Sequence, residues 1–208
     1  MEGSGVCVAV LAAGESRRMG FPKLVAPFAK STLLERAVGA ALASVAERVC
    51  VVTGASHEAM APILERIAAS AEKPLDIVRN ERWAEGQGSS VAAAACYGHE
   101  QGCDALVMVV ADQPFVSTEV LNELVAIQRE SGAPVVMCSD GAQRGNPAAF
   151  DAPLFEHLEA LQGDEGARAV IRALSPEMIK TVAVGPRLLC DADTPEEFAR
   201  LESEVLHG

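Results

Sequence analysis

The chain has 208 residues, half of them hydrophobic, and a formal net charge of -12 at pH 7. This length favours one α/β domain, and the acidic charge argues against nucleic acid or an anionic membrane as a partner, because phosphate surfaces are bound by basic faces. No apolar run approaches the roughly 20 residues that cross a bilayer, and no secretion signal opens the chain, so we expect a cytoplasmic protein.

Short apolar runs alternate with helical patterns along the chain. Runs rich in Val or Leu and without polar alternation predict strands that are buried on both faces of a mostly parallel sheet. They cover residues 6–11, 49–52, 75–78, 105–110 and 135–138. The alternation predicts a single-domain, doubly wound α/β fold over residues 1–208, in which ligands bind beyond the carboxyl ends of the strands.

Capping residues mark where several helices begin. Thr32 and Glu35 have the spacing of a capping box before a helix over residues 33–45. Another helix is predicted from Ser117, and a last one after Thr194 as its N-cap. These caps predict where the preceding loops end.

A turn with glycines and three cations follows the first strand. Residues 11–23 read LAAGESRRMGFPK, so backbone N–H groups and cations can converge there on a triphosphate. Five residues separate Gly14 from Gly20, and Lys23 stands three positions later, which excludes a Walker A loop. A G-x-G-x-x-G dinucleotide turn is absent from this loop as well.

Carboxylates follow in positions that suit a metal ion. Asp112 comes directly after the run 105–110 and stands two residues before Pro114, which places its carboxylate at the same sheet edge as the first loop. Since Mg²⁺ usually takes one or two protein carboxylates and keeps several waters, Asp191 or Asp193 would complete the site, with Asp191 favoured. Alternatively, Asp112 forms a turn and the later pair only stabilises a helix N-terminus.

The first loop matches the pattern L-A-A-G-x-S-x-R-M-G-x-x-K at every fixed position. Further segments, in order, are WAEGQGSS, ADQP, RGNP, GDEGAR and DADTPEE. Over nearly its whole length the chain resembles the MobA-like nucleotidyltransferases that handle the molybdenum cofactor, and most of all the cytidylyltransferases among them. The resemblance implies a Rossmann-like fold, Mg²⁺ as cofactor, and transfer of CMP from CTP to the phosphate of molybdopterin with release of pyrophosphate.

The resemblance also implies roles for individual residues. Lys23, Arg18 and Asp112 would be catalytic, and the metal ligands would be Asp112, Asp191 and Asp193. The nucleotide would be bound by Leu11, Ala12, Ala13, Gly14, Arg18, Lys23, Gly88, Ser89 and Ser90. The acceptor would be bound by Arg144, Asn146, Asp164 and Arg168. Residues 1–115 would thus form mainly the nucleotide-binding half, and residues 116–208 mainly the acceptor-binding half.

Some of these positions have alternative interpretations. Guanylyl-transferring relatives carry glycine where this chain has Ala13, whose methyl group would narrow the space beside the base and favour a pyrimidine. Relatives often carry serine in place of Gly88, and Ser89 or Ser90 can instead be a helix N-cap. Asp164 can likewise be an N-cap, and Arg17, at a position that the pattern leaves free, can face water.

Three other functions share these features. The first is guanylyl transfer to the same acceptor, and the second is nucleotidyl transfer to a sugar or alditol phosphate. The third is a non-catalytic carrier that hands the cofactor to a molybdenum hydroxylase or its maturation factor. The RGNP and GDEGAR segments argue against sugar phosphates, and Asp112 with Lys23 argues against a carrier alone.

The cysteines and histidines suggest no further site. The six cysteines include no C-x-x-C pair, and they are predicted to be reduced, mostly buried thiols. A thiol that contacts the dithiolene of molybdopterin is the alternative. His57, His99 and His157 show no metal-ligand spacing, which argues against a zinc site.

Overall fold

The computed structural model describes residues 5–207. The strands are β1 (Val6–Ala12), β2 (Pro27–Phe28), β3 (Ser31–Thr32), β4 (Arg48–Thr53), β5 (Leu75–Arg79), β6 (Ala105–Val110), β7 (Val135–Ser139), β8 (Arg144–Asp151) and β9 (Ile179–Ala183). The α-helices are α1 (Leu33–Ala43), α2 (His57–Ala68), α3 (Gln87–Glu100), α4 (Thr118–Ser131), α5 (Phe155–Glu159), α6 (Arg168–Ala173) and α7 (Pro195–His207). Shorter 3-10 helices are η1 (Trp83–Glu85), η2 (Ala152–Leu154), η3 (Pro176–Met178) and η4 (Pro186–Leu189).

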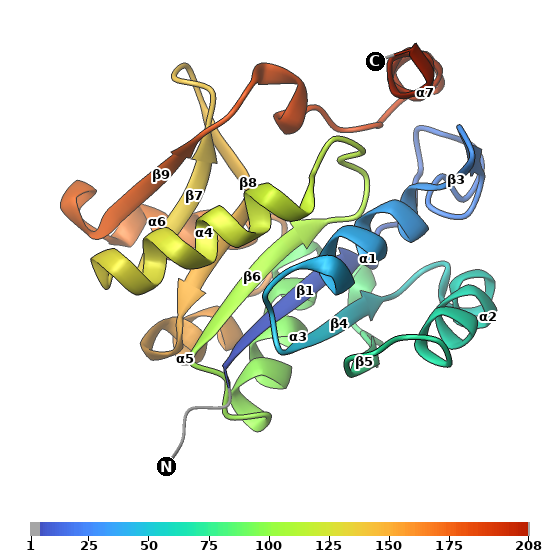
Figure 1. The fold of residues 1–208 in the computed structure, drawn as a ribbon. Coiled ribbons are helices and arrows are strands. Elements are labelled where there is room, and N and C mark those ends of the chain that lie inside the picture. The colour runs from blue at the N-terminus through green and yellow to red at the C-terminus, as the bar shows by residue number, and fades with distance from the viewer. Residues whose placement is uncertain (1–4, 208) are drawn as a thin grey trace.

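Seven strands form one sheet in the order β5-β4-β1-β6-β8-β7-β9 (Figure 1). The five predicted strands are confirmed, and β5, β4, β1 and β6 pair in parallel as expected. The predicted regular alternation of strand and helix is wrong in the second half, because β8 follows β7 directly and pairs antiparallel with both β7 and β6. The sheet as a whole remains mostly parallel and doubly wound.

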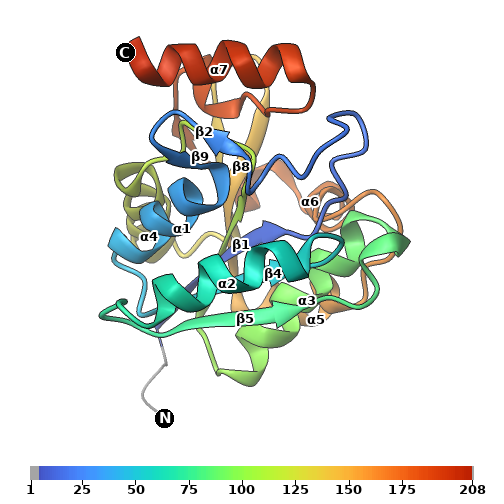
Figure 2. The ribbon, with the colours of Figure 1, turned by 90° about the vertical axis from the view of Figure 1, so that its right-hand side faces the viewer.

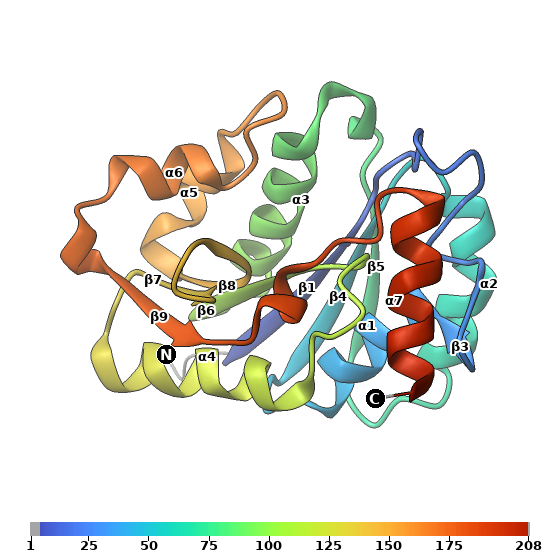
Figure 3. The ribbon, with the colours of Figure 1, turned by 90° about the horizontal axis from the view of Figure 1, so that it is seen from above.

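Helices cover both faces of the sheet (Figure 3). In β1, Val6, Val8 and Val10 belong to the core beneath α1 and α4, whereas Cys7 and Ala9 belong to the core beneath α3 and α5. Both sets of side chains are therefore removed from water, which explains why the strand sequences are apolar without alternation.

The predicted caps are present at α1 and α7. The backbone N–H of Glu35 donates to Thr32 Oγ1 at 3.1 Å, and that of Glu197 donates to Thr194 Oγ1 at 3.2 Å. The first helix is shorter than predicted: α1 ends at Ala43, and Val45 is half exposed. Ser117 occupies the N-cap position of α4, although its side chain makes no capping hydrogen bond.

Helix α7 packs beside the segment that follows the first loop (Figure 2). The ring of Phe198 contacts Phe21 and Phe28 edge to face, with centroids 5.8 Å and 5.0 Å apart. Glu202 Oε1 accepts a hydrogen bond from the backbone N–H of Ala29 at 2.7 Å. The last helix of the chain therefore holds the first loop in place.

All six cysteines are free thiols. Four are buried, as predicted, whereas Cys96 is exposed and Cys190 is half-buried. Within residues 5–207, no helix has both the length and the apolar character that a membrane span requires.

Candidate functional site

Five charged side chains meet at the carboxyl edge of the sheet. The buried Lys23 Nζ donates to Asp112 Oδ2 at 2.7 Å and to Asp193 Oδ1 at 3.0 Å. Arg18 Nη2 donates to Asp193 Oδ2 at 2.7 Å, although 68% of the Arg18 side chain is exposed. The first loop, the end of β6 and the segment before α7 thus supply one ionic cluster, which also includes Asp191.

The first loop reaches this cluster through a tight turn. The backbone N–H of Met19 donates to Ser16 O at 2.9 Å, and both Ser16 (φ 57°) and Gly20 (φ 72°) adopt left-handed backbone conformations. This backbone conformation costs free energy for Ser16, whereas glycine adopts it without steric strain. Met19 is buried in the core, so the turn directs Arg18 and Lys23 toward the strand edge on either side of an anchored residue.

Asp112 and Asp191 are brought together by two contacts between the segment after β6 and the segment before α7. The backbone N–H of Ala192 donates to Asp112 O at 3.0 Å, and Gln113 Nε2 donates to Asp191 Oδ1 at 2.9 Å. Gln113 was not among the predicted site residues. Its place in the ADQP segment, next to Asp112, was the signal in the sequence.

The charges in the cluster shift one another's pKa values. Burial opposes the charged form of Lys23, but Asp112 and Asp193 outweigh it and raise the lysine's pKa. For Asp193, burial is outweighed by Lys23 and Arg18, which lower its pKa. Restricted hydration and then the charge of Asp112 raise the pKa of Asp191 to about 6. Because Asp191 reaches the solvent, water weakens this last shift.

The donor set fits a hard divalent cation held by two carboxylates. Three carboxylates face two cations, which leaves one negative charge unbalanced beside Asp112 and Asp191. Asp193 is already engaged by Arg18 and Lys23, and within residues 5–207 no group of three His, Cys, Asp or Glu side chains is arranged to hold a metal. Asp112 and Asp191 are sufficient for Mg²⁺, which keeps most of its waters.

The predicted nucleotide-binding residues at the end of β1 pack beside β4, the neighbouring strand in the sheet, and Gly54 after it. Leu11 and Ala12 end β1, Ala13 is buried, and Gly14 is exposed. A Cβ atom built on Gly54, just after β4, would lie 2.8 Å from Ala13 Cβ. The methyl group of Ala13 therefore lies against Gly54.

The start of α3, with its N-cap Gly86, contacts a distant loop of the second half. The backbone N–H of Gly88 donates to Gly163 O at 2.7 Å, and a Cβ on Gly88 would lie 2.8 Å from the backbone of Gln162. This close approach explains why glycine stands at position 88. A Cβ on Gly86 would lie 2.5 Å from Asp164 Oδ1.

Ser89 and Ser90 lie inside α3, whose N-cap position is Gly86, so neither serine is an N-cap. Both are buried, and both hydroxyls accept hydrogen bonds from Asn80 Nδ2, at 2.9 Å and 3.1 Å. Asn80 was missed because it follows a strand without belonging to any quoted segment. It ties the end of β5 to the start of α3.

The four predicted acceptor residues are less closely grouped. Arg144 and Asn146 lie in β8, and Arg168 is the first residue of α6, so Asp164 is not a helix N-cap. Within residues 5–207 no hydrogen bond or ion pair joins these four residues. Asp164 lies toward the first loop, where its charge adds to the raised pKa of Arg17, after the larger effect of Glu15.

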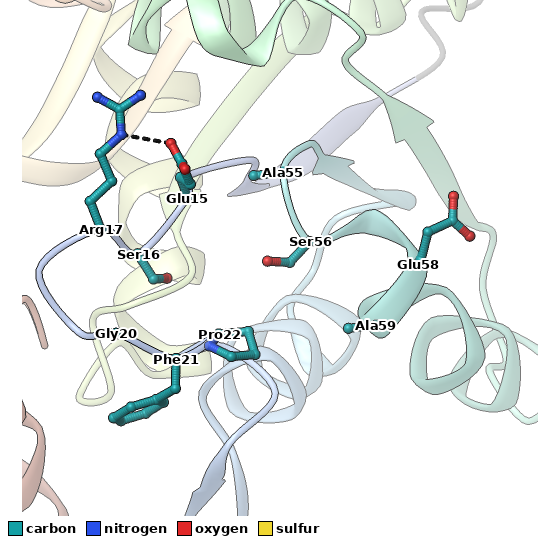
Figure 4. A pocket seen from close by; sticks show the side chains of 10 residues that line it. All are labelled: Glu15, Ser16, Arg17, Gly20, Phe21, Pro22, Ala55, Ser56, Glu58 and Ala59. Carbon is teal, nitrogen blue, oxygen red and sulfur yellow. Dashed lines mark hydrogen bonds and ion pairs between the residues drawn. The ribbon is translucent and has the colours of Figure 1, made fainter.

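A cavity of about 450 Å³ lies beside the first loop, not at the ionic cluster (Figure 4). One side is lined by six residues of the loop, and the other by Ala55, Ser56, Glu58 and Ala59; the loop residues are Glu15, Ser16, Arg17, Gly20, Phe21 and Pro22. Arg17 is 78% exposed and forms an ion pair with Glu15, which agrees with the interpretation that it faces water.

Comparisons with known proteins agree with this arrangement. Residues 8–178 match the family model of the MobA-like NTP transferase domain. The purine catabolism protein PucB of Bacillus subtilis is 34% identical over 199 residues, which cover 90% of this chain and 91% of that protein. A probable molybdenum cofactor guanylyltransferase of Mycobacterium avium is 30% identical over 196 residues, 92% of each.

The crystal structure of a Mycobacterium tuberculosis protein in complex with manganese shares the fold. Its TM-score is 0.74 at 22% identity, and the alignment covers 95% of this chain and 97% of that one. Because the family model covers most of the chain and the fold agrees, the chain belongs to the MobA-like NTP transferase family and is a nucleotidyltransferase.

Proposed function

We propose that the chain is a Mg²⁺-dependent cytidylyltransferase that transfers CMP from CTP to the phosphate of molybdopterin and releases pyrophosphate. The observation that carries the proposal is the ion pair of the buried Lys23 with the partly buried Asp112, 2.7 Å apart, beside a second carboxylate at the carboxyl edge of the sheet. It sets a phosphate-binding cation and a metal-binding pair next to each other.

Lys23 and Arg18 bind the triphosphate by exchanging Asp193 for phosphate oxygens. Arginine grips phosphate in a fork and lysine acts as a point charge, so the two residues have distinct tasks. Asp112 and Asp191 hold Mg²⁺, which supplies charge neutralisation on the phosphates when it is bound. The manganese complex of the M. tuberculosis neighbour supports a divalent metal in this fold. Asp193 returns the two cations to their places after release.

The acceptor is bound by the second half of the chain. Arg144 and Arg168 are exposed and free to bind its phosphate, and Asn146 and Asp164 can pair with the pterin edge. Contact of Gly88 with Gly163 joins this half to the nucleotide-binding half. The name of the M. avium relative supports a molybdenum cofactor acceptor. A molybdenum hydroxylase or its maturation factor would receive the product in the cytoplasm.

The preference for CTP rests on Ala13. Its methyl group lies against Gly54 and takes up space beside the end of β1, which favours a pyrimidine over a purine. Gly88, Ser89 and Ser90, in the first turn of α3, would bind the base or ribose. The M. avium relative is named a guanylyltransferase, so GTP is the competing donor.

The test has a binding step and a turnover step. Melting temperatures are measured with CTP, GTP, ATP or UTP plus Mg²⁺, because a ligand at 100 times its Kd adds about 2.7 kcal/mol of stability. Pyrophosphate release is then measured with molybdopterin and with a panel of sugar phosphates. We expect the largest shift with CTP, and release only with molybdopterin.

Each alternative gives a different result. The largest shift with GTP would indicate a guanylyltransferase, and release with a sugar phosphate would change the acceptor. Molybdopterin binding that needs neither Mg²⁺ nor nucleotide, without release, would indicate a carrier. A folded protein that releases no pyrophosphate with any nucleotide would refute the proposed activity.

A further inference from the structure

Gln113 is a buried amide beside the acidic cluster, and only half of it is hydrogen-bonded. It directly follows Asp112 and is 6% exposed. Its Nε2 donates to Asp191 Oδ1 at 2.9 Å, whereas its Oε1 is enclosed by protein and has no partner within residues 5–207. Flipping the Gln113 amide by 180° would place its Oε1 against Asp191 Oδ1 and would leave Nε2 without a partner instead.

Such a side chain lowers the stability of the folded protein. Most buried polar groups in native proteins are hydrogen-bonded, and an unsatisfied one carries its full desolvation cost. An unbranched apolar side chain such as methionine would fill the same space without that cost. A residue that breaks this rule is a candidate for a functional role, and its neighbours decide whether it has one.

The partner of Gln113 identifies the function concerned. Within residues 5–207, Asp191 has no other side-chain hydrogen bond, whereas Asp193 is held by both Arg18 and Lys23. The neighbouring backbone of Ala192 is linked to the Asp112 segment by the hydrogen bond from Ala192 N to Asp112 O, at 3.0 Å. Asp191 therefore depends on Gln113 to keep its carboxylate beside Asp112.

We propose that Gln113 is a positioning residue of the metal site. By donating to Asp191 Oδ1, it restricts the rotation of that carboxylate and leaves the second oxygen for the divalent cation that Asp112 shares. Partners that orient metal ligands in this way commonly change metal affinity 10–100-fold when they are removed. The inference rests on the metal site of the proposed function, but it concerns only the amide.

The test uses Gln113→Met, with Mn²⁺ alone as the probe. Mn²⁺ affinity is measured by electron paramagnetic resonance, and the melting temperature is measured without metal. We expect Mn²⁺ affinity to fall about 10–100-fold, while the melting temperature stays the same or rises because the unsatisfied oxygen is gone. Water can replace the lost hydrogen bond at Asp191, which reaches the solvent.

Gln128→Met is the matched control. Gln128 is 7% exposed in α4, and its Nε2 is likewise buried without a partner in the described part of the chain. This variant is expected to keep the wild-type Mn²⁺ affinity with an equal or higher melting temperature. In an Asp191→Asn background, Gln113→Met should cost no further affinity, because Gln113 acts through that carboxylate.

Two results would overturn the positioning role while leaving the proposed function intact. One is Mn²⁺ affinity of Gln113→Met within about twofold of wild type, the margin expected between independent sites. The other is a clearly lower melting temperature or an unfolded variant, which would make Gln113 a packing residue. A wild-type protein that binds no Mn²⁺ would instead refute the metal site itself, and both proposals with it.

Discussion

The residues predicted to bind the nucleotide donor and its metal, here called the donor cluster, differ in organisation from the residues predicted to bind the acceptor. Arg18, Lys23, Asp112 and Asp193 are joined by ion pairs of 2.7 to 3.0 Å, and Lys23 is buried. Arg144, Asn146, Asp164 and Arg168 are exposed or half-exposed, and in residues 5–207 none of them pairs with another. The first group is already joined by ion pairs in the free protein, whereas the side chains of the second group contact solvent separately.

Electrostatics accounts for this difference. Burying the charge of a lysine lowers the stability of the fold unless carboxylates compensate it, so the ion pairs of Lys23 must already be present in the free protein. Exposed arginines are stabilised by water and need no protein partner. A bound acceptor phosphate would supply the anion that they lack.

The largest effect is expected from Asp112→Asn, which removes the proposed metal ligand and the partner of Lys23. We expect pyrophosphate release to fall roughly 10²–10³-fold, the loss typical of an electrostatic group that acts in the transition state. Asp104→Asn is the matched control, because Asp104 precedes β6 as Asp112 follows it, and it is exposed. Circular dichroism checks folding, and less than a tenfold loss would remove Asp112 from catalysis.

Lys23→Met should reduce kcat/KM for the nucleotide roughly 10²-fold, because it removes the preorganised charge that we propose binds the phosphates. The melting-temperature shift with CTP should disappear even without acceptor. Lys30→Met, at an exposed lysine nearby, is expected to behave like wild type. A normal CTP shift in Lys23→Met would place the triphosphate elsewhere.

Arg144→Met and Arg168→Met test the acceptor region. Each should raise the KM for molybdopterin roughly tenfold, since a hydrogen bond to a charged group contributes about 1.5–3 kcal/mol. The CTP shift should remain unchanged, because these arginines lie apart from the donor cluster. A changed melting-temperature shift with CTP in either variant would contradict the assignment of nucleotide and acceptor binding to separate regions.

Gly88→Ser tests the contact between the regions. The new Cβ would lie 2.8 Å from the backbone of Gln162, so the segment beside Asp164 must move. We expect KM for both substrates to rise several-fold. Gly39→Ala is the control, because a Cβ there meets nothing within 4 Å, and alanine suits its helix. Wild-type kinetics in Gly88→Ser would show that the contact does not matter for binding.

The smallest effect is expected from Arg17→Met. The Arg17 side chain is 78% exposed, and within residues 5–207 it forms an ion pair only with Glu15. Exposed pairs contribute about 0–1 kcal/mol, so pyrophosphate release should change less than about twofold. Arg18→Met, one residue on, should reduce it more. Equal losses in the two variants would contradict the assignment of Arg18 alone to the cluster.

Much of the fold was predictable because its signals are local. The Val-rich runs and the capping boxes at Thr32 and Thr194 predicted five strands and two helix starts. Strand β8 was missed because its residues, with Gly145, Pro147 and two alanines, have low strand propensity. Strand β9 was missed because it is a short edge strand with exposed residues.

The first loop and the order of the motifs were read from the sequence by itself, because spacing along the chain determines them, and the roles of Lys23 and Asp112 were predicted from the same residues. Only the tertiary structure decided that Asp193 pairs with the cations, that Gln113 donates to Asp191, and that Asn80 donates to Ser89. These contacts join residues far apart in the chain. Their partners depend on which strand edges and loops pack together, and short-range patterns do not encode that.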